Sequence, residues 1–223
     1  MRAKSRVKLQ LFAAALAATA LSSTANAADF IFNDDPFAGT TVLQTPGRQV
    51  VGNELSIPDF NIATDRLLFN PSVFGLTGPL SFANSLAANL PGSGVNFISL
   101  QDIDADGNVA NGVLNNAGLS ANLIAANTNV ATPGFFIYFN SGLNLNRLVY
   151  STDLSSSTAD LRVLARFTNQ TGTGASAALQ QFSAANIGVV PEPSVWAMMI
   201  LGFGVIGGAM RQRKQQFRLK LAH

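Results

Sequence analysis

Residues 102–108 form the one group of side chains in this sequence whose types and spacing have an evident chemical use. In order they are Asp102, Ile103, Asp104, Ala105, Asp106, Gly107 and Asn108. Three carboxylates at alternate positions followed by a glycine match the first half of a calcium-binding loop, because calcium prefers hard oxygen ligands and glycine permits a sharp turn. The candidate metal ligands are Asp102, Asp104, Asp106 and, through its backbone carbonyl, Asn108.

The second half of this loop departs from the calcium-binding pattern. Its twelfth position is Val113, where a bidentate glutamate would complete the coordination shell. A calcium site here would be weak, or ligands from elsewhere in the fold would complete it. The alternative is an acidic surface turn between two strands with no cofactor, and both interpretations stay open at this point.

Side chains suited to catalysis are scarce in the rest of the chain. The sequence has no cysteine, its one histidine is His223, and residues 28–190 contain no lysine. A thiol nucleophile, a Ser-His-Asp triad, a lysine base and a zinc centre are therefore not expected in that span. Its eleven acids leave room for a glycosidase pair, but none lies in a recognisable motif. We expect no enzymatic activity, with a polysaccharide-active enzyme as the weaker alternative.

The charge of the chain is divided between its ends and its middle. The overall net charge is +2, but four basic residues lie in the first eight positions and five lie between 211 and 220. Residues 28–190 carry five arginines against eleven acids, a net charge of −6. Because such an acidic segment lacks the counterion-release drive towards a polyanion, we expect no nucleic-acid partner.

Residues 1–27 have the three parts of a secretory signal peptide. A basic start is followed by an apolar run, 11–21, that is too short to span a bilayer as a stable helix. Ala25 and Ala27 then place small residues at positions −3 and −1 of a cleavage site before Ala28. We therefore predict a signal helix that is removed after export through the Sec machinery, and a permanent anchor helix is the alternative.

A second arrangement lies at the other end of the chain, in residues 191–214. A Pro-Glu-Pro sequence precedes an uncharged run of 17 residues, 194–210. As a helix this run would be about 25 Å long, just enough to cross the hydrocarbon core of a membrane. Trp196, near its start, suits the membrane interface. The basic residues that follow the run would stay cytoplasmic, so everything before it would face outward.

These features together resemble the PEP-CTERM sorting domain of Gram-negative bacteria, which has a Pro-Glu-Pro motif, a short glycine-bearing transmembrane helix and a basic stop. The matching residues are Pro191, Glu192, Pro193, Trp196, Gly202, Gly204, Arg211, Arg213 and Lys214. The resemblance implies processing near Pro191–Pro193 by exosortase, a membrane-embedded cysteine protease, after transient anchoring in the inner membrane. It further implies release to the cell surface, commonly alongside exopolysaccharide.

The chain departs from this family pattern at its end, because residues 215–223 continue beyond the basic cluster. Phe217, Leu219 and Leu221 alternate with basic residues there, which is compatible with a cytoplasmic extension on the inner leaflet. A plain single-pass anchor without processing is the alternative to the sorting interpretation.

The exported domain, 28–190, is predicted to be mainly β, because turn signals separate many short apolar runs. We expect strands at 29–33, 49–57, 95–100, 134–140, 147–151, 160–168 and 187–190. Weak helical patterns lie at 80–90 and 116–127, and one further turn of helix at 182–186. The predicted fold is a mostly antiparallel β-sandwich or jelly-roll-like domain.

Two of the predicted strands have distinctive patterns. The run 134–140 is continuously apolar, as expected for a strand buried on both faces, and Tyr138 within it is predicted to pack in the core. In 160–168 the alternation predicts that Leu161, Val163, Ala165 and Phe167 share one face. Arg162 and Arg166 would then lie on the opposite, solvated face. Asp34, Asp35 and Pro36 are predicted to form a turn.

The function expected from these observations is that of a non-enzymatic surface or extracellular-matrix protein, sorted by exosortase and associated with exopolysaccharide. A glycan-binding module, with or without a requirement for calcium, is the main alternative. Tyrosine rings and asparagine amides in the exported domain could contribute to such binding.

Overall fold

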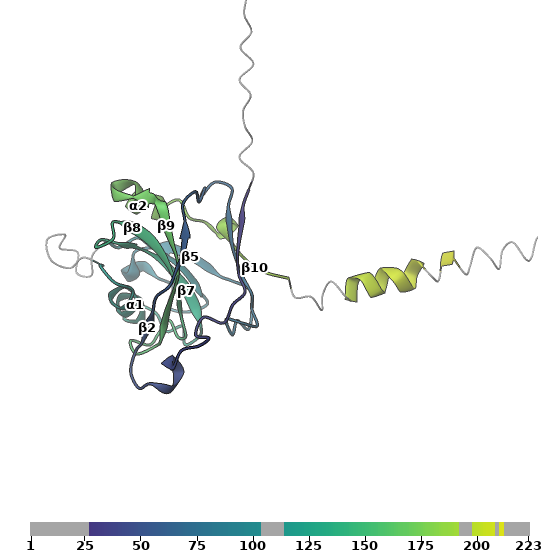
Figure 1. Cartoon of the computed structure of the whole chain (residues 1–223), viewed down its shortest axis with the longest axis horizontal. Coiled ribbons are helices and arrows are strands. Elements are labelled where there is room, and N and C mark those ends of the chain that lie inside the picture. Colours follow the sequence, from purple (N-terminus) through teal and green to yellow (C-terminus); the bar gives the residue numbers. More distant parts are fainter. Residues whose placement is uncertain (1–26, 104–113, 192–197, 208–209, 212–223) are drawn as a thin grey trace, which may run out of the picture.

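The computed structural model describes residues 27–103, 114–191, 198–207 and 210–211. The described part of residues 27–191 is mainly β, as predicted from the sequence, and contains two α-helices (Figure 1). The strands are β1 (Asp29–Phe32), β2 (Val50–Val51), β3 (Leu55–Ile57), β4 (Arg66–Phe69), β5 (Phe82–Ser85), β6 (Phe97–Leu100), β7 (Gly134–Asn140), β8 (Leu145–Ser151), β9 (Leu161–Thr171) and β10 (Ile187–Val189). The helices are α1 (Ala117–Ala125) and α2 (Gly172–Leu179), and short 3-10 segments lie at Val42–Gln44, Ala87–Asn89 and Ala184–Asn186.

The strands form two mixed or parallel sheets rather than an antiparallel fold. The larger sheet has the order β2-β9-β8-β7-β6-β5, with β3 also paired to β9, and the smaller sheet has the order β1-β4-β10. Among the described residues, only the pairs β7–β8 and β8–β9 are antiparallel, and the other six pairs are parallel. The prediction of mostly antiparallel pairing is therefore wrong. Parallel neighbours need long connections, such as 101–133 between β6 and β7, rather than tight hairpins. The sandwich and jelly-roll parts of the prediction stay predictions.

An aromatic core joins the smaller sheet to one face of the larger sheet. Phe69 of β4 and Phe135 of β7 are fully buried, and their ring centroids lie 4.0 Å apart. Phe74 and Tyr150 extend this cluster around the Phe135 ring. Since each buried aromatic side chain removes a large apolar area from water, this cluster is the main apolar contact between the two sheets.

The opposite face of the larger sheet packs against helix α1. Asn116 caps the helix, because its side-chain oxygen accepts a hydrogen bond from the Leu119 N–H at 2.9 Å. Ile124 of the helix then packs with Phe136 and Tyr138 of β7 in a second apolar cluster. The predicted helix at 116–127 and the core position of Tyr138 are both confirmed.

Strand β7 spans Gly134–Asn140, the range predicted from its sequence, and it is buried on both faces. The prediction for β9 is wrong in one respect, because the β8–β9 register shifts between Leu148 and Val149. A shift of one residue moves the following side chains to the other face of a strand. Leu161 and Val163 therefore belong to the cluster with α1, whereas Ala165 and Phe167 belong to the aromatic core.

The helix predicted at 80–90 is also wrong, because this segment forms β5 and the short 3-10 turn at Ala87–Asn89. Of the predicted signal peptide, 1–27, only Ala27 lies within the described residues. Residues 198–207 and 210–211, within the predicted sorting segment 191–214, are helical. In the described part of the chain, no helix combines the length and apolar character needed to cross a membrane.

Candidate functional site

The boundary between the folded domain and the C-terminal segment lies at the end of β10. This strand pairs in parallel with β4, and the Val190 N–H donates a hydrogen bond to the Phe69 carbonyl at 2.9 Å. The next residue, Pro191, is exposed and has no N–H with which to continue the ladder. The regular fold therefore ends directly before the Pro-Glu-Pro sequence.

Asn186 fixes the start of β10 against the loop before β4. Its side-chain amide donates to the Ile62 carbonyl at 2.5 Å and to the Asp65 carbonyl at 3.0 Å, and its oxygen accepts from the Ser183 N–H at 2.9 Å. The residue is only 3% exposed. Because buried hydrogen bonds of this kind are costly to leave unmade, Asn186 holds the last strand in the sheet.

The structure places the predicted sorting residues only in part. Pro191 is exposed, and Gly202, Gly204 and Arg211 lie in exposed helical positions. Glu192, Pro193, Trp196, Arg213 and Lys214 lie outside the described residues. At the signal-cleavage site, Ala27 is described and exposed, whereas Ala25 lies outside the described residues.

The predicted calcium loop is likewise described only at its start. The Asp102 carboxylate accepts a hydrogen bond from the Ala87 N–H at 2.6 Å, so it closes the turn after β5. Asp104, Asp106 and Asn108 lie outside the described residues. Across the described ranges, no group of three or more acidic, histidine or cysteine side chains is placed to hold a metal ion.

A cavity of about 380 Å³ lies beside the smaller sheet, where the end of β1 meets β3 and β9. Its lining residues are Ile31, Phe32, Asn33, Asp34, Asp35, Pro36, Asn53, Leu55, Phe74, Arg162 and Leu164. Apolar side chains therefore lie next to two carboxylates, two amides and one guanidinium. Small-molecule pockets in proteins typically measure about 300–1,000 Å³ and combine apolar and polar lining groups, and this cavity falls within that range. We refer to it as the polar cavity.

The polar side chains of the cavity differ in how strongly they are held. One Asp35 carboxylate oxygen accepts the Phe37 N–H at 2.9 Å, so that side chain is fixed. Within the described part of the chain, the Asp34 carboxylate and the Arg162 guanidinium have no hydrogen-bond partner and remain able to bind a ligand. Tyr150 does not line the cavity but lies buried in the core beside Phe74. Burial, and secondarily the charge of Asp35, raise the pKa of Tyr150 to about 12, and its hydroxyl donates to the Phe74 carbonyl at 3.0 Å.

The sequence did not indicate this cavity. Arg162 was predicted to lie with Arg166 on one solvated face of β9, but the register shift places the two side chains on opposite faces. Arg162 is half-buried beside the predicted turn at Asp34 and Asp35, whereas Arg166 is exposed and does not line the cavity. The arginine and the two acids are far apart in the sequence, so no local pattern could reveal their proximity.

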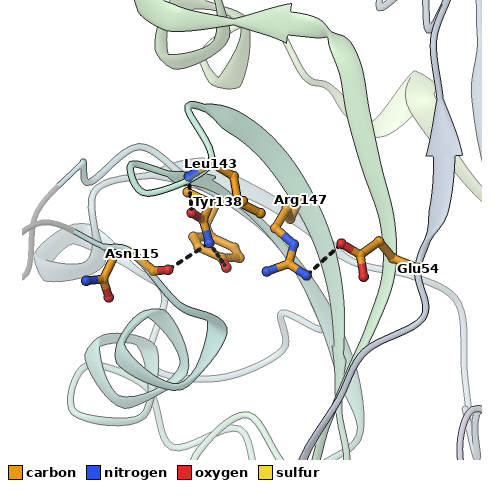
Figure 2. A network of polar contacts seen from close by, with 6 residues as sticks. Glu54, Asn115, Tyr138, Leu143 and Arg147 are labelled. Carbon is orange, nitrogen blue, oxygen red and sulfur yellow. Dashed lines mark hydrogen bonds and ion pairs between the residues drawn. The ribbon is translucent and has the colours of Figure 1, made fainter.

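A second group of polar side chains, shown in Figure 2, lies on the face of β7 and β8 that carries Tyr138. Arg147 and Glu54 form an ion pair at 2.8 Å, and their side chains are only 14% and 13% exposed. Figure 2 shows Arg147 reaching from β8 towards Glu54, which precedes β3. The pair therefore ties the edge of the sheet across β9 to its centre.

Asn140 organises the other part of this group. Its amide nitrogen donates to the Tyr138 hydroxyl and to the Asn115 carbonyl, both at 2.9 Å, and its oxygen accepts the Leu143 N–H at 2.8 Å (Figure 2). Burial raises the pKa of Tyr138, although the hydrogen bond from Asn140 and the charge of Arg147 act in the opposite direction. These buried groups fix the β7–β8 turn and are not exposed to a ligand.

Comparison with known proteins identifies the C-terminal segment. Residues 189–214 match the family model described as the PEP-CTERM protein-sorting motif. The match begins at the last residue of β10 and ends at the basic cluster, and it confirms the resemblance found in the sequence. The chain therefore carries a signal for export and exosortase-mediated sorting to the cell surface. No curated protein and no solved structure matches the chain.

Proposed function

We propose that this chain is a non-enzymatic protein of the cell surface or extracellular matrix, which exosortase processes near Pro191–Pro193 and which associates with exopolysaccharide. The observation that carries the proposal is the direct junction between β10 and the sorting motif. Strands β1 to β10 all lie before the proposed processing site in the sequence. Cleavage there would release the complete domain without removing any strand.

The junction also constrains where processing would take place. Only residues 191–193 separate the last sheet hydrogen bond, made by Val190, from the apolar run that starts at Ser194. Even a fully extended chain spans at most about 3.6 Å per residue, so this connection would reach roughly 14 Å. The domain would thus lie close to the membrane surface until its release.

The sorting part of the proposal is tested by expressing the chain in its host with and without exosortase. Intact-mass analysis would report both cleavage sites at once, with a chain that starts at Ala28 and ends near Pro191–Pro193 as the expected product. In the strain without exosortase we expect the chain to retain residues up to 223 and to stay with the inner membrane. An identical mass and location in both strains would overturn the proposal.

The non-enzymatic part rests on the side chains available in residues 28–190, which include no histidine, lysine or cysteine. The test is incubation of the purified chain with host polysaccharide, followed by size analysis of the polymer. We expect no depolymerisation. Turnover that is lost on substitution of one acid would establish the polysaccharide-active enzyme instead.

The polar cavity favours a second candidate function, the binding of a polysaccharide. Its apolar walls could contact a sugar ring, and the unpaired Arg162 and Asp34 side chains could hydrogen-bond to hydroxyl groups. We further propose that calcium, if it is required, is held by the segment that contains Asp102, Asp104, Asp106 and Asn108.

Two matched arginine variants test the binding proposal. Arg162→Ala removes a side chain from the polar cavity, whereas Arg166→Ala removes an exposed side chain from the same strand outside it. In pulldown on host exopolysaccharide, we expect Arg162→Ala to weaken retention several-fold and Arg166→Ala to leave it unchanged. Equal effects of the two variants would exclude the cavity as the binding site. Loss of retention with a chelator would assign calcium a role, and unchanged retention would remove it.

A further inference from the structure

Asp65 is a buried carboxylate placed beside the residue that signal-peptide removal would make the first of the mature chain. The residue is 3% exposed, and its Oδ1 accepts a hydrogen bond from the Ala28 N–H at 2.9 Å. The same carboxylate accepts the Asn61 N–H at 2.9 Å and the Thr64 hydroxyl at 3.0 Å. Three donors therefore converge on it from two segments of the chain.

No cationic side chain balances this buried charge. Among the described residues the structure contains one ion pair, Arg147–Glu54, and Asp65 is not part of it. The neighbouring Arg66 side chain lies instead near Gly188 of β10. A buried charge is costly unless it is both paired and hydrogen-bonded, and the three hydrogen bonds to Asp65 meet only the second of these conditions.

Cleavage before Ala28 would supply that cation. Hydrolysis adds water across the Ala27–Ala28 bond, so that Ala27 leaves with a new carboxylate and the Ala28 nitrogen takes up protons to become an α-ammonium. We infer that Asp65 is the binding site for this ammonium group, and that signal-peptide removal converts a neutral amide hydrogen bond into an ion pair. The inference rests on the proposed export and cleavage of the chain.

The existing geometry suits this pairing. Ala28 is already held in place, because its carbonyl accepts the Arg66 N–H at 2.9 Å and continues the β1–β4 ladder. The nitrogen is therefore 2.9 Å from Asp65 before any positive charge is present. A charge-assisted hydrogen bond is stronger than a neutral one at the same distance, so cleavage would strengthen the attachment of β1 without rearranging it.

The same loop also holds the other end of the domain, since the Asp65 carbonyl accepts the Asn186 amide at the start of β10. In the smaller sheet, β4 lies between β1 and β10, the first and last strands of the domain. The ion pair would thus stabilise the loop to which both terminal strands are attached.

The amino-acid composition makes the inference directly measurable. Residues 28–190 contain no lysine, so in the exported chain the Ala28 α-amine is accompanied only by Lys214 and Lys220. The full-length chain from a host without exosortase is labelled with a trace of acetic anhydride at pH 7.5. Mass spectrometry of tryptic peptides then compares the Ala28 amine with the two lysines as internal references.

Only the neutral amine reacts, and an ion pair that raises the pKa of the amine by one unit reduces its neutral fraction at pH 7.5 about six- to eightfold. We therefore expect the Ala28 amine of the native chain to react about six- to eightfold more slowly than the same amine in urea, relative to the lysines. Asp65→Asn should restore the fast reaction. Asp59→Asn, which removes an exposed carboxylate that makes no contact with Ala28, should behave like the native protein.

The outcomes separate this inference from the proposed export. A chain that starts at Ala28 but whose amine is equally reactive in the native protein and in urea would overturn the ion pair alone. A mature chain that starts at another residue would overturn both the predicted cleavage and the ion pair. If Asp65→Asn does not fold, the comparison of native and urea-treated wild-type chain still decides the question.

Discussion

The ion pair between Arg147 and Glu54 offers the sharpest test of how the larger sheet is held together. Both side chains are about six-sevenths buried, and Arg147 Nε is a buried donor with no partner. Replacing Glu54 with leucine would leave the guanidinium buried without its counter-charge. Removing one partner of a buried pair costs about 3–5 kcal/mol. Because solvent still reaches a small part of each side chain, we expect a loss of about 2–3 kcal/mol in the free energy of unfolding.

The double variant Arg147→Met/Glu54→Leu removes both charges and fills similar space with apolar atoms. Its free energy of unfolding should lie within about 1 kcal/mol of the wild-type value, since well-packed apolar replacements of buried pairs are often neutral. The single variant Arg147→Met leaves Glu54 buried without its partner and should also cost about 2–3 kcal/mol. The coupling energy of the double-mutant cycle would then be at least about 3 kcal/mol, well above the 0–1 kcal/mol of an exposed pair.

The assay is urea unfolding of the processed chain, followed by far-UV circular dichroism and linear extrapolation. Asp59→Asn serves as a control, because this exposed carboxylate has no hydrogen bond among the described residues and should change stability by less than about 0.5 kcal/mol. A coupling energy below about 0.5 kcal/mol would show that Arg147 and Glu54 act independently and that the reasoning from burial is wrong.

Three further expectations concern stability. Gly134→Ala should destabilise the fold by about 2 kcal/mol or more in urea unfolding, because a Cβ would lie 2.5 Å from the Asn96 carbonyl oxygen. Gly174→Ala is the matched control: a Cβ there would meet open space, so the variant should stabilise α2 by about 0.5 kcal/mol. The pKa of Tyr150 is raised to about 12, so its contribution is fully present below the ordinary pKa of tyrosine and is lost as the pH rises towards 12. The unfolding temperature should therefore fall between about pH 10 and pH 12, and it should fall less in Tyr150→Phe. Asn186→Ala removes four hydrogen bonds and should lower stability by about 2–3 kcal/mol, with faster amide exchange in β10. Unchanged exchange in β10 would show that this side chain does not hold the strand.

The sequence was most informative where a local pattern alone decides the structure. Strand β7 could be predicted to the residue, because its continuous apolar run suits a strand that is buried on both faces. Helix α1 begins after Asn116, a good capping residue, and its range was predicted nearly as well. The sorting motif needed only its own residues for recognition, because its parts follow one another without interruption.

Features that depend on pairing between distant segments could not be predicted in the same way. Strand β4 has only four residues, and its central place between β1 and β10 comes from contacts with both ends of the domain. The irregularity opposite Leu148 inverts half of β9, and its one local sign in the sequence is Leu164, an apolar residue where the alternation calls for a polar one. The polar cavity follows from this inversion, so it could not be inferred from residues 160–168 alone.

The smaller sheet connects the fold to the order in which the chain would leave the cell. Its three strands come from residues 29–32, 66–69 and 187–189, so the sheet stays incomplete until the last strand has crossed the membrane. Such long-range pairing forms late, because the intervening chain must first be available. The apolar run that begins at Ser194 would halt export only a few residues after β10 emerges. With processing near Pro191–Pro193 as proposed, completion of the sheet and arrival at the processing site would be nearly simultaneous events. A domain whose last strand lay much earlier in the chain would have no such link between folding and release.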